Sequence, residues 1–253
     1  MELISIKSPS QIDKMRKAGR ITAAARKLAG EMVEPGVTTL QIDREVKKFI
    51  LSCGAKPSFL GYGGFPGSAC ISVNEVVIHG IPDHRKLCEG DIVSIDVGAY
   101  IDGFHGDCAA TFYCGKVSDE ARKLVEVTEQ SFWEAMKMAR AGNRVSDISH
   151  AVQQYAEGHG CGVVRSFVGH GVGAKLHEAP EVPNYGAAGH GPRLVPGMTL
   201  AVEPMITAGH WEVKVLADKW TTVTCDGFLA AHYENSILIT DGDPEILTVV
   251  DGF

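Results

Sequence analysis

Two acidic side chains, Asp96 and Asp107, lie in a stretch whose pattern is typical of a β-hairpin. Strand-favouring residues surround Asp102-Gly103, a pair that favours a two-residue type I′ turn. With that turn Asp96 faces Ala109, and because side chains alternate along a strand, both acids lie on one face of the hairpin. Their Cβ atoms are expected to be about 7 Å apart or less.

Two carboxylates that converge among apolar residues repel each other and lose hydration, which costs free energy. A divalent metal ion between them, or a pair of ions, would remove that cost. The alternative is a solvated hairpin that carries two surface acids. The hairpin alone does not discriminate between these interpretations, so other ligand-type residues in the chain must decide.

The second half of the chain holds three such residues. His170 lies in the glycine-rich run GHGVG, Glu203 lies in the apolar run AVEP, and Glu234 follows His232-Tyr233. Four carboxylates and one imidazole suit two ions such as Mn, Fe or Co with bridging carboxylates better than a closed structural Zn site. Two-metal sites activate a bridging water for hydrolysis, so these residue types predict a two-metal hydrolase.

Composition excludes several other classes of protein. The 253 residues are 45% apolar and 22% charged, with a net charge of −7, so no basic surface for nucleic acid or membrane is expected. Mean hydropathy is +0.02. The seven cysteines form no CxxC pair, and neither a signal peptide nor a long apolar run is present, which predicts a reduced, cytoplasmic protein. No apolar stripe is left over, which favours a monomer.

The pattern of helix starts and strands predicts an α+β protein. Ser8 to Gln11 and Thr38 to Gln41 each have the form of a capping box that opens a helix. Two more helices are expected to start at Ser118 and at Val145. A second hairpin is expected around the turn Asp226-Gly227. Further strands are expected at residues 69–73, 76–79, 199–202, 221–225, 228–234 and 237–240.

The chain also repeats itself. Gly36 and Gly142 each precede a helix start, and Gly61-Tyr62-Gly63 is similar to Gly169-His170-Gly171 at an offset of 108. The runs around Gly90 and Gly197 are similar at an offset of 107, and a carboxylate follows six residues later in both cases. This repetition predicts one domain, residues 1–253, with pseudo-symmetric halves of about 1–115 and 116–253 whose acids meet near a twofold axis.

Seven motifs follow one another along the chain in the order VVIHGIP, SIDVGA, FHGDCAATF, GHGVG, LHEAP, AVEPM and HYENS. Together they carry a resemblance to the methionine aminopeptidase family that spans residues from about 8 to about 250. The resemblance implies the pita-bread fold, with two halves of antiparallel sheet backed by helices. The chain lacks a zinc-binding extension and a helical insertion, so it is similar to the short bacterial type 1 form.

The resemblance also implies a role for each ligand-type residue. Asp96 would chelate one metal ion, His170 would bind the second, and Asp107 and Glu234 would bridge both. Glu203 would bind metal and help to deprotonate a bridging water. The ions implied are Co, Mn or Fe, with Zn also possible.

Two histidines complete the implied mechanism. The bridging hydroxide would attack the carbonyl of an N-terminal methionine, in a peptide or a nascent chain, with a contact to the ribosome conceivable. His177 would stabilise the oxyanion, and His79 would assist the leaving nitrogen. Each of them has a second interpretation as a satisfied core or loop histidine.

An apolar pocket for methionine is implied beside the metal ions, with a small residue preferred after the methionine. Tyr62, Phe65, Cys70 and Trp220 match the family's pocket positions. Three positions depart from the familiar bacterial pattern and leave the pocket's shape open: Phe59, Gly63 and Leu176.

Two alternatives remain, and one set of residues is set aside. A prolidase or Xaa-Pro aminopeptidase shares the five ligand types but normally carries an extra N-terminal domain, and a non-enzymatic binding module of the same fold would lose ligands. Among the remaining histidines, His105 is expected to lie nearest the ligands. Those expected not to bind metal are His84, His105, His150, His159, His190, His210 and His232.

Overall fold

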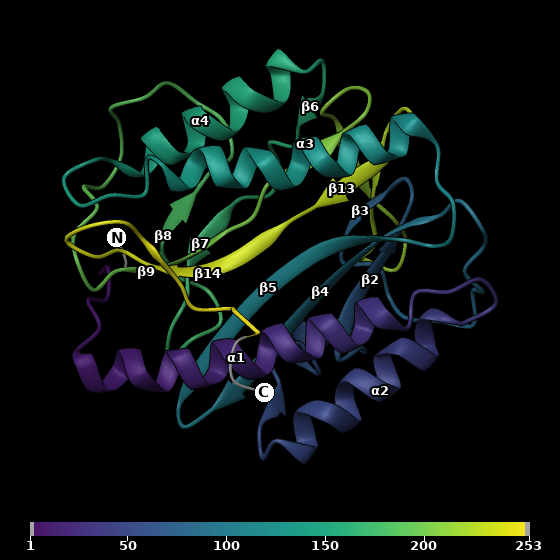
Figure 1. The fold of residues 1–253 in the computed structure, drawn as a ribbon, viewed down its shortest axis with the longest axis horizontal. Coiled ribbons are helices and arrows are strands. Elements are labelled where there is room, and N and C mark those ends of the chain that lie inside the picture. The colour runs from purple at the N-terminus through teal and green to yellow at the C-terminus, as the bar shows by residue number, and fades with distance from the viewer. Residues whose placement is uncertain (1–2, 251–253) are drawn as a thin grey trace.

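The computed structural model describes residues 3–250 and has the pita-bread fold, in which two pairs of helices pack on a nine-stranded sheet. Figure 1 shows the helix pairs at opposite ends of the view, with β5 and β14 running between them. The helices are α1 (Pro9–Glu31), α2 (Thr39–Ser52), α3 (Asp119–Met136), α4 (Val145–Gly158) and the short 3₁₀ helix η1 (Tyr62–Gly64). The strands are β1 (Lys56–Pro57), β2 (Ala69–Val73), β3 (Val76–Ile78), β4 (Ile92–Ile101), β5 (Phe104–Tyr113), β6 (Gly162–Val163), β7 (Gly169–Gly171), β8 (Glu178–Val182), β9 (Thr199–Val202), β10 (Met205–Thr207), β11 (Val213–Val215), β12 (Thr222–Thr224), β13 (Ala230–His232), β14 (Glu234–Leu238) and β15 (Glu245–Ile246).

The helices begin where the capping residues predict. The Gln11 side chain accepts a 2.8 Å hydrogen bond from the backbone N–H of Ser8, and Gln41 does the same for Thr38. At the start of α3 the Ser118 hydroxyl accepts from the N–H of Ala121 at 3.1 Å. These bonds satisfy donors that the first turn of a helix leaves without partners, which fixes each starting point.

The predicted hairpin of β4 and β5 is confirmed in register. Asp96 faces Ala109, and Asp107 faces Gly98. Asp102 has φ of 53° and Gly103 has φ of 90°, the pair of positive values that a type I′ turn requires. This turn therefore decides which face of the sheet receives the two acids.

The main path through the large sheet follows the order β1-β4-β5-β14-β9-β7-β8, with β2 also paired to β4 and β15 to β14. Within this sheet, strands from the first and second halves of the chain meet where β5 pairs with β14. That contact has two residue pairs in register, Ala109 with Glu234 and Cys108 with Asn235. We call this contact the seam.

Each helix pair covers its own apolar core. Residues of α1 and α2 pack against β2 and β4, and residues of α3 and α4 pack against β9 and β14. The two cores therefore lie on the two sides of the seam, and a smaller cluster that includes Met15, Phe104 and Leu238 spans it. Buried members of the first core include Ile21, Ile42, Ile71 and Ile95, and those of the second include Leu124, Ile148, Leu200 and Ile237.

Four glycines reproduce the internal repeat in backbone geometry. Gly36 and Gly142, which precede helices α2 and α4, have φ of 93° and 94°. Gly90 and Gly197, which precede β4 and β9, have φ of 94° and 90°. Such positive angles favour glycine, so equivalent turns lead into equivalent elements on both sides of the seam.

Two predictions about local structure are wrong. Residues 61–63 enter the 3₁₀ helix η1, whereas residues 169–171 form strand β7, so the similarity between them is one of glycine spacing alone. The turn Asp226-Gly227 does not close a hairpin, because β12 pairs with β11 and β3 whereas β13 pairs with β10. That turn leads from one three-stranded sheet to another.

Within residues 3–250, no helix combines the length and apolarity needed to cross a membrane.

Candidate metal centre

All of the site residues predicted from the sequence line one cavity of about 150 Å³. The cavity has a charged end, formed by the acids and histidines, and an apolar end. Its lining consists of Phe59, Tyr62, Phe65, Cys70, His79, Asp96, Asp107, His170, Leu176, His177, Glu203, Trp220 and Glu234.

Neighbouring strands of the large sheet present the four acids. Asp96 lies in β4 and Asp107 in β5, while Glu234 begins β14 and Glu203 directly follows β9. Because β4, β5, β14 and β9 are consecutive in the sheet, residues far apart in sequence converge at the seam. His170, in the middle of β7, enters from the next strand beyond β9.

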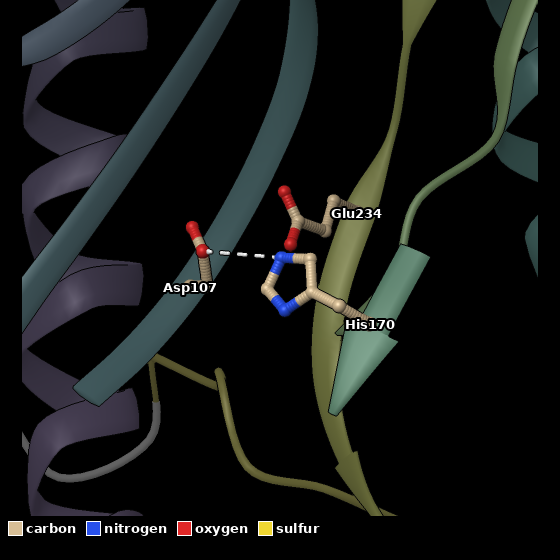
Figure 2. A group of neighbouring side chains, drawn as sticks. All are labelled: Asp107, His170 and Glu234. Carbon is tan, nitrogen blue, oxygen red and sulfur yellow. Dashed lines mark ion pairs between the residues drawn. The ribbon is translucent and has the colours of Figure 1, made fainter. Parts of the chain in front are cut away.

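Three of these residues form the tightest cluster, which Figure 2 shows between β5, β14 and β7. Asp107, His170 and Glu234 each offer a ligand atom, and these atoms lie within 4.8 Å of one another. His170 Nε2 lies 3.9 Å from Asp107 Oδ2 and 3.6 Å from Glu203 Oε1. A hydrogen bond from His170 Nδ1 to the Gly171 carbonyl, at 2.8 Å, leaves Nε2 with its lone pair directed toward the acids.

The acids have unusual electrostatics. Burial raises the pKa of Asp96 to about 7. Burial, together with the charges of neighbouring acids, holds the pKa of Asp107, Glu203 and Glu234 well above its usual range. Burial also lowers the pKa of His170 to about 3, so its imidazole is neutral.

Unpartnered oxygen atoms show what this cluster fits. Asp96 Oδ1, Asp107 Oδ1 and Glu234 Oε1 are buried and have no hydrogen-bond partner. Buried carboxylates without donors are costly, and they are the ligands that hard and borderline divalent cations prefer. The donor set of carboxylate oxygens and one neutral imidazole nitrogen therefore fits divalent metal.

A fourth histidine beside the acids was missed in the sequence. His232 is buried, and its Nε2 atom lies 3.9 Å from Glu203 Oε2 and 3.8 Å from Glu234 Oε2 without a hydrogen-bond partner. His105, which was expected to lie nearest the ligands, instead shares a 2.9 Å hydrogen bond with Ser58 and lies outside the cavity lining. The position of His232 two residues before Glu234 was the signal that could have indicated it.

The two predicted catalytic histidines flank the charged end. His177 Nδ1 lies 2.7 Å from the Tyr62 hydroxyl, and its ring centroid is 4.2 Å from that of His170. His79 follows β3 with φ of 58°, a strained angle for a residue other than glycine and one often found at functional sites. Burial lowers the pKa of His79 to about 4, so it is neutral.

The apolar end closes around aromatic rings. Phe65 meets Trp220 edge to face at 5.2 Å, and Phe59, Cys70 and Leu176 complete a buried cluster with them. Burial, and then the charge of Asp96, raises the pKa of the Cys70 thiol well above its usual range. The thiol is therefore protonated and contributes to the wall as a small apolar group.

Gly63 shapes the rim of this end. A Cβ atom at this position would lie 3.1 Å from the Trp220 ring, and φ of 54° is strained for other residues. A larger residue here would therefore displace the indole. The three positions that differ from the familiar bacterial pattern thus all lie at or next to the pocket wall.

Comparison with known proteins identifies the family. Residues 13–241 match the model for metallopeptidase family M24. The chain therefore belongs to metallopeptidase family M24, and its cluster of acids and histidine is a candidate divalent metal site.

Individual relatives indicate which members of family M24 this chain is similar to in sequence and fold. The chain is 52% identical to the methionine aminopeptidase of Clostridium acetobutylicum over 250 residues, which cover 98% of this chain and 100% of the relative. It is 50% identical to methionine aminopeptidase 1 of Bacillus subtilis over 248 residues, with the same coverage of both chains. The fold matches methionine aminopeptidase from Thermotoga maritima with a TM-score of 0.96 at 46% identity, covering 97% of this chain and 99% of that one.

Prolidases share the fold at greater distance. The match to prolidase from Pyrococcus furiosus has a TM-score of 0.78 at 22% identity and covers 96% of this chain and 65% of that one. At this identity the likeness shows a common fold alone.

Proposed function

We propose that this protein is a methionine aminopeptidase, which hydrolyses the peptide bond after an N-terminal methionine and prefers a small second residue. The observation that carries the proposal is the two-ended cavity, in which buried acids adjoin a closed aromatic pocket. A metal centre alone supports many hydrolases, whereas the apolar end gives this one a place for a thioether side chain. The identity of about 50% to methionine aminopeptidases supports the same substrate.

Two divalent ions, of Mn, Fe or Co and conceivably Zn, are the cofactors that we propose. The residues that would hold them are Asp96, Asp107, His170, Glu203 and Glu234. Ions held there would lower the pKa of a bound water and polarise the scissile carbonyl.

The remaining chemistry belongs to side chains of this chain. Glu203, whose pKa burial holds well above its usual range, would accept the proton of the attacking water. The Tyr62 hydroxyl lies 2.7 Å from His177 Nδ1 and orients the imidazole ring. His177 would donate a hydrogen bond to the oxygen of the methionine carbonyl. His79 would hydrogen-bond the scissile nitrogen as it leaves.

The apolar end would hold the methionine side chain. Phe65 and Trp220 offer ring faces and edges to the thioether, and Phe59, Cys70 and Leu176 would close the pocket behind it. A substrate would lie with its α-amine toward the acids and its second residue between the histidines. A small second residue suits that position because Tyr62 and His177 are already in contact there.

We also propose how the molecule is organised and where it works. The chain would form one catalytic domain, with halves of about 1–115 and 116–253. It would act as a cytoplasmic monomer on peptides and nascent chains, and a contact with the ribosome is a further expectation. The repeated glycine turns support the two halves, and the net charge of −7 argues against nucleic acid and membrane as partners.

Reconstitution with metal tests the proposal. Metal-free protein loaded with Mn, Fe or Co is incubated with Met-Ala-Ser and, separately, with a Xaa-Pro peptide, and released amino acid is measured. We expect methionine from the first peptide and nothing from the second. Cleavage of the Xaa-Pro peptide instead would make the protein a prolidase, and cleavage of neither with any metal would indicate a binding module.

A further inference from the structure

Arg26, on helix α1, reaches the seam between β5 and β14. Its Nη1 atom donates hydrogen bonds to the carbonyl oxygens of Ala109 and Glu234, both at 3.1 Å. The same atom lies 3.3 Å from Oδ1 of the Asn235 side chain. One guanidinium group therefore contacts both strands at the point where the two halves of the sheet join.

The position of these bonds within the seam is informative. Ala109 and Glu234 face each other and are one of only two residue pairs in register between β5 and β14. With so short a ladder, few backbone bonds hold the strands at a fixed spacing. A guanidinium nitrogen that bonds a carbonyl on each side adds a link across them.

The guanidinium approaches from the face opposite the acids. It lies 6.0 Å from the ring of Tyr233 and also contacts the side chain of Asn235, the two neighbours of Glu234. Because side chains alternate along a strand, Glu234 points to the other face, where Figure 2 shows it turned toward Asp107 and His170. Arg26 thus lies behind the candidate ligands without touching their carboxylates.

Residue positions connect this link to the metal centre. Glu234 is itself a candidate ligand, and Ala109 lies two residues beyond Asp107 in β5 and faces Asp96 in β4. A shift of β5 relative to β14 would therefore change the separation of Asp107 and Glu234 directly.

We infer that Arg26 is a positioning residue that fixes the spacing of β5 and β14 and thereby sets the affinity of the acid cluster for divalent metal. The inference rests on the proposed metal centre. Partners that orient metal ligands from outside the coordination shell typically change metal affinity about 10- to 100-fold when they are removed. An effect of that size is expected here.

The test compares Arg26→Gln, Arg26→Lys and a control, Lys27→Gln. Lys27 is the next residue on the same helix, and its side chain is exposed, so the control removes one positive charge without touching the seam. Mn²⁺ is titrated into each metal-free protein, and free Mn²⁺ is measured by electron paramagnetic resonance. Circular dichroism at the same temperature shows that each variant is folded.

We expect Arg26→Gln to bind Mn²⁺ about 10- to 100-fold more weakly and Lys27→Gln to bind as the parent does. Arg26→Lys should also bind weakly, because the lysine side chain is one atom shorter and its ammonium would not reach both carbonyl oxygens. Should Arg26→Gln fail to fold, Arg26→Lys decides. Parent-like Mn²⁺ affinity in a folded Arg26→Lys protein, or in Arg26→Gln, would overturn the positioning role. Failure of the parent itself to bind Mn²⁺ would instead refute the proposed metal centre.

Discussion

Buried acids occur in two settings in this molecule. Asp43, on α2, is 8% exposed, and its Oδ1 atom accepts backbone hydrogen bonds from Ser68 at 2.6 Å and Ala69 at 3.0 Å. Asp107 is 3% exposed, but its Oδ1 atom has no partner. The first carboxylate holds two segments of chain together, whereas the second has an oxygen left for a ligand. Burial alone therefore does not separate a structural acid from a functional one, but the count of donors around it does.

Asp43 and the acids at the seam also differ in how burial affects the stability of the folded protein. The two amide hydrogen bonds to Asp43 offset part of the cost of its desolvation, and removing the acid leaves the amides without partners. Four acids that converge with three of their buried oxygens unpartnered repel each other, so the folded state bears a cost that a divalent cation removes. The metal-free protein should therefore be destabilised at the seam and intact at α2.

The largest contrast is expected in catalysis. Asp107→Ala should lower methionine release from Met-Ala-Ser by more than about 100-fold, since the loss of a group that merely orients a ligand costs up to about that much. Asp43→Ala should change the rate per folded molecule by less than about twofold, because Asp43 lies outside the cavity lining. Equal losses in both variants would show that the two acids do not differ in the way proposed.

Asp43→Ala and Asp107→Ala should change the stability of the metal-free protein in opposite directions. Asp43→Ala is expected to lower the free energy of unfolding by about 2–4 kcal/mol, because two buried amides lose a charged acceptor. Asp107→Ala is expected to raise it, because one of the repelling carboxylates is removed. Urea unfolding in the presence of a chelator measures both values. A decrease in both variants would contradict the comparison.

A smaller effect is expected from pH. Because the pKa of Asp96 is raised from 3.8 to about 7 in the folded state, the folded protein binds a proton more tightly than the unfolded chain does. The stability that this contributes is complete below pH 4 and is lost as pH rises to about 7. Metal-free protein should therefore unfold at lower temperature at pH 7.5 than at pH 5.

The matched control is Asp96→Asn. This variant should show a flatter dependence of the unfolding temperature on pH, because one titrating group has been removed. A metal-free parent whose unfolding temperature increases between pH 5 and pH 7.5 would contradict the raised pKa.

The smallest expected effect concerns Tyr62. Its hydroxyl lies 2.7 Å from His177 Nδ1, and one such hydrogen bond contributes about 1 kcal/mol net. Tyr62→Phe should therefore lower kcat for Met-Ala-Ser about fivefold with little change in Mn²⁺ affinity. A loss of Mn²⁺ binding of the same size would assign Tyr62 to the metal centre rather than to the orientation of His177.

Sequence reasoning succeeded where the signal was local. The Asp102-Gly103 turn fixed the register of β4 and β5, and the capping residues Ser8 and Thr38 fixed the first turns of α1 and α2. In these cases a few adjacent residues determine hydrogen bonds that form nearby. The ordered motifs contain the acids and histidines that line the charged end of the cavity, and the resemblance to the family's pocket positions indicated the residues of the apolar end.

Sequence reasoning failed where the residues or strands in contact come from distant parts of the chain. The Asp226-Gly227 turn has the same composition as the first one, but the strands around it pair elsewhere, and turn chemistry cannot indicate long-range pairing. Arg26 was not singled out, because a basic residue on an amphipathic helix normally faces solvent. His232 was set aside although it lies two residues before Glu234 in the sequence, because its proximity to Glu203 arises only in the fold.

The seam has a further consequence. The two proposed halves, with similar glycine turns on both sides of the seam, would give the sheet the geometry of an isologous interface between two identical subunits. In such a dimer every ligand would occur twice, in mirrored roles. Here one chain forms both sides, so they are free to differ: β7, beside β9, supplies the imidazole of His170, whereas β2, beside β4, supplies the thiol of Cys70. Covalent linkage thus allows a near-symmetric scaffold to distinguish the two ends of a substrate.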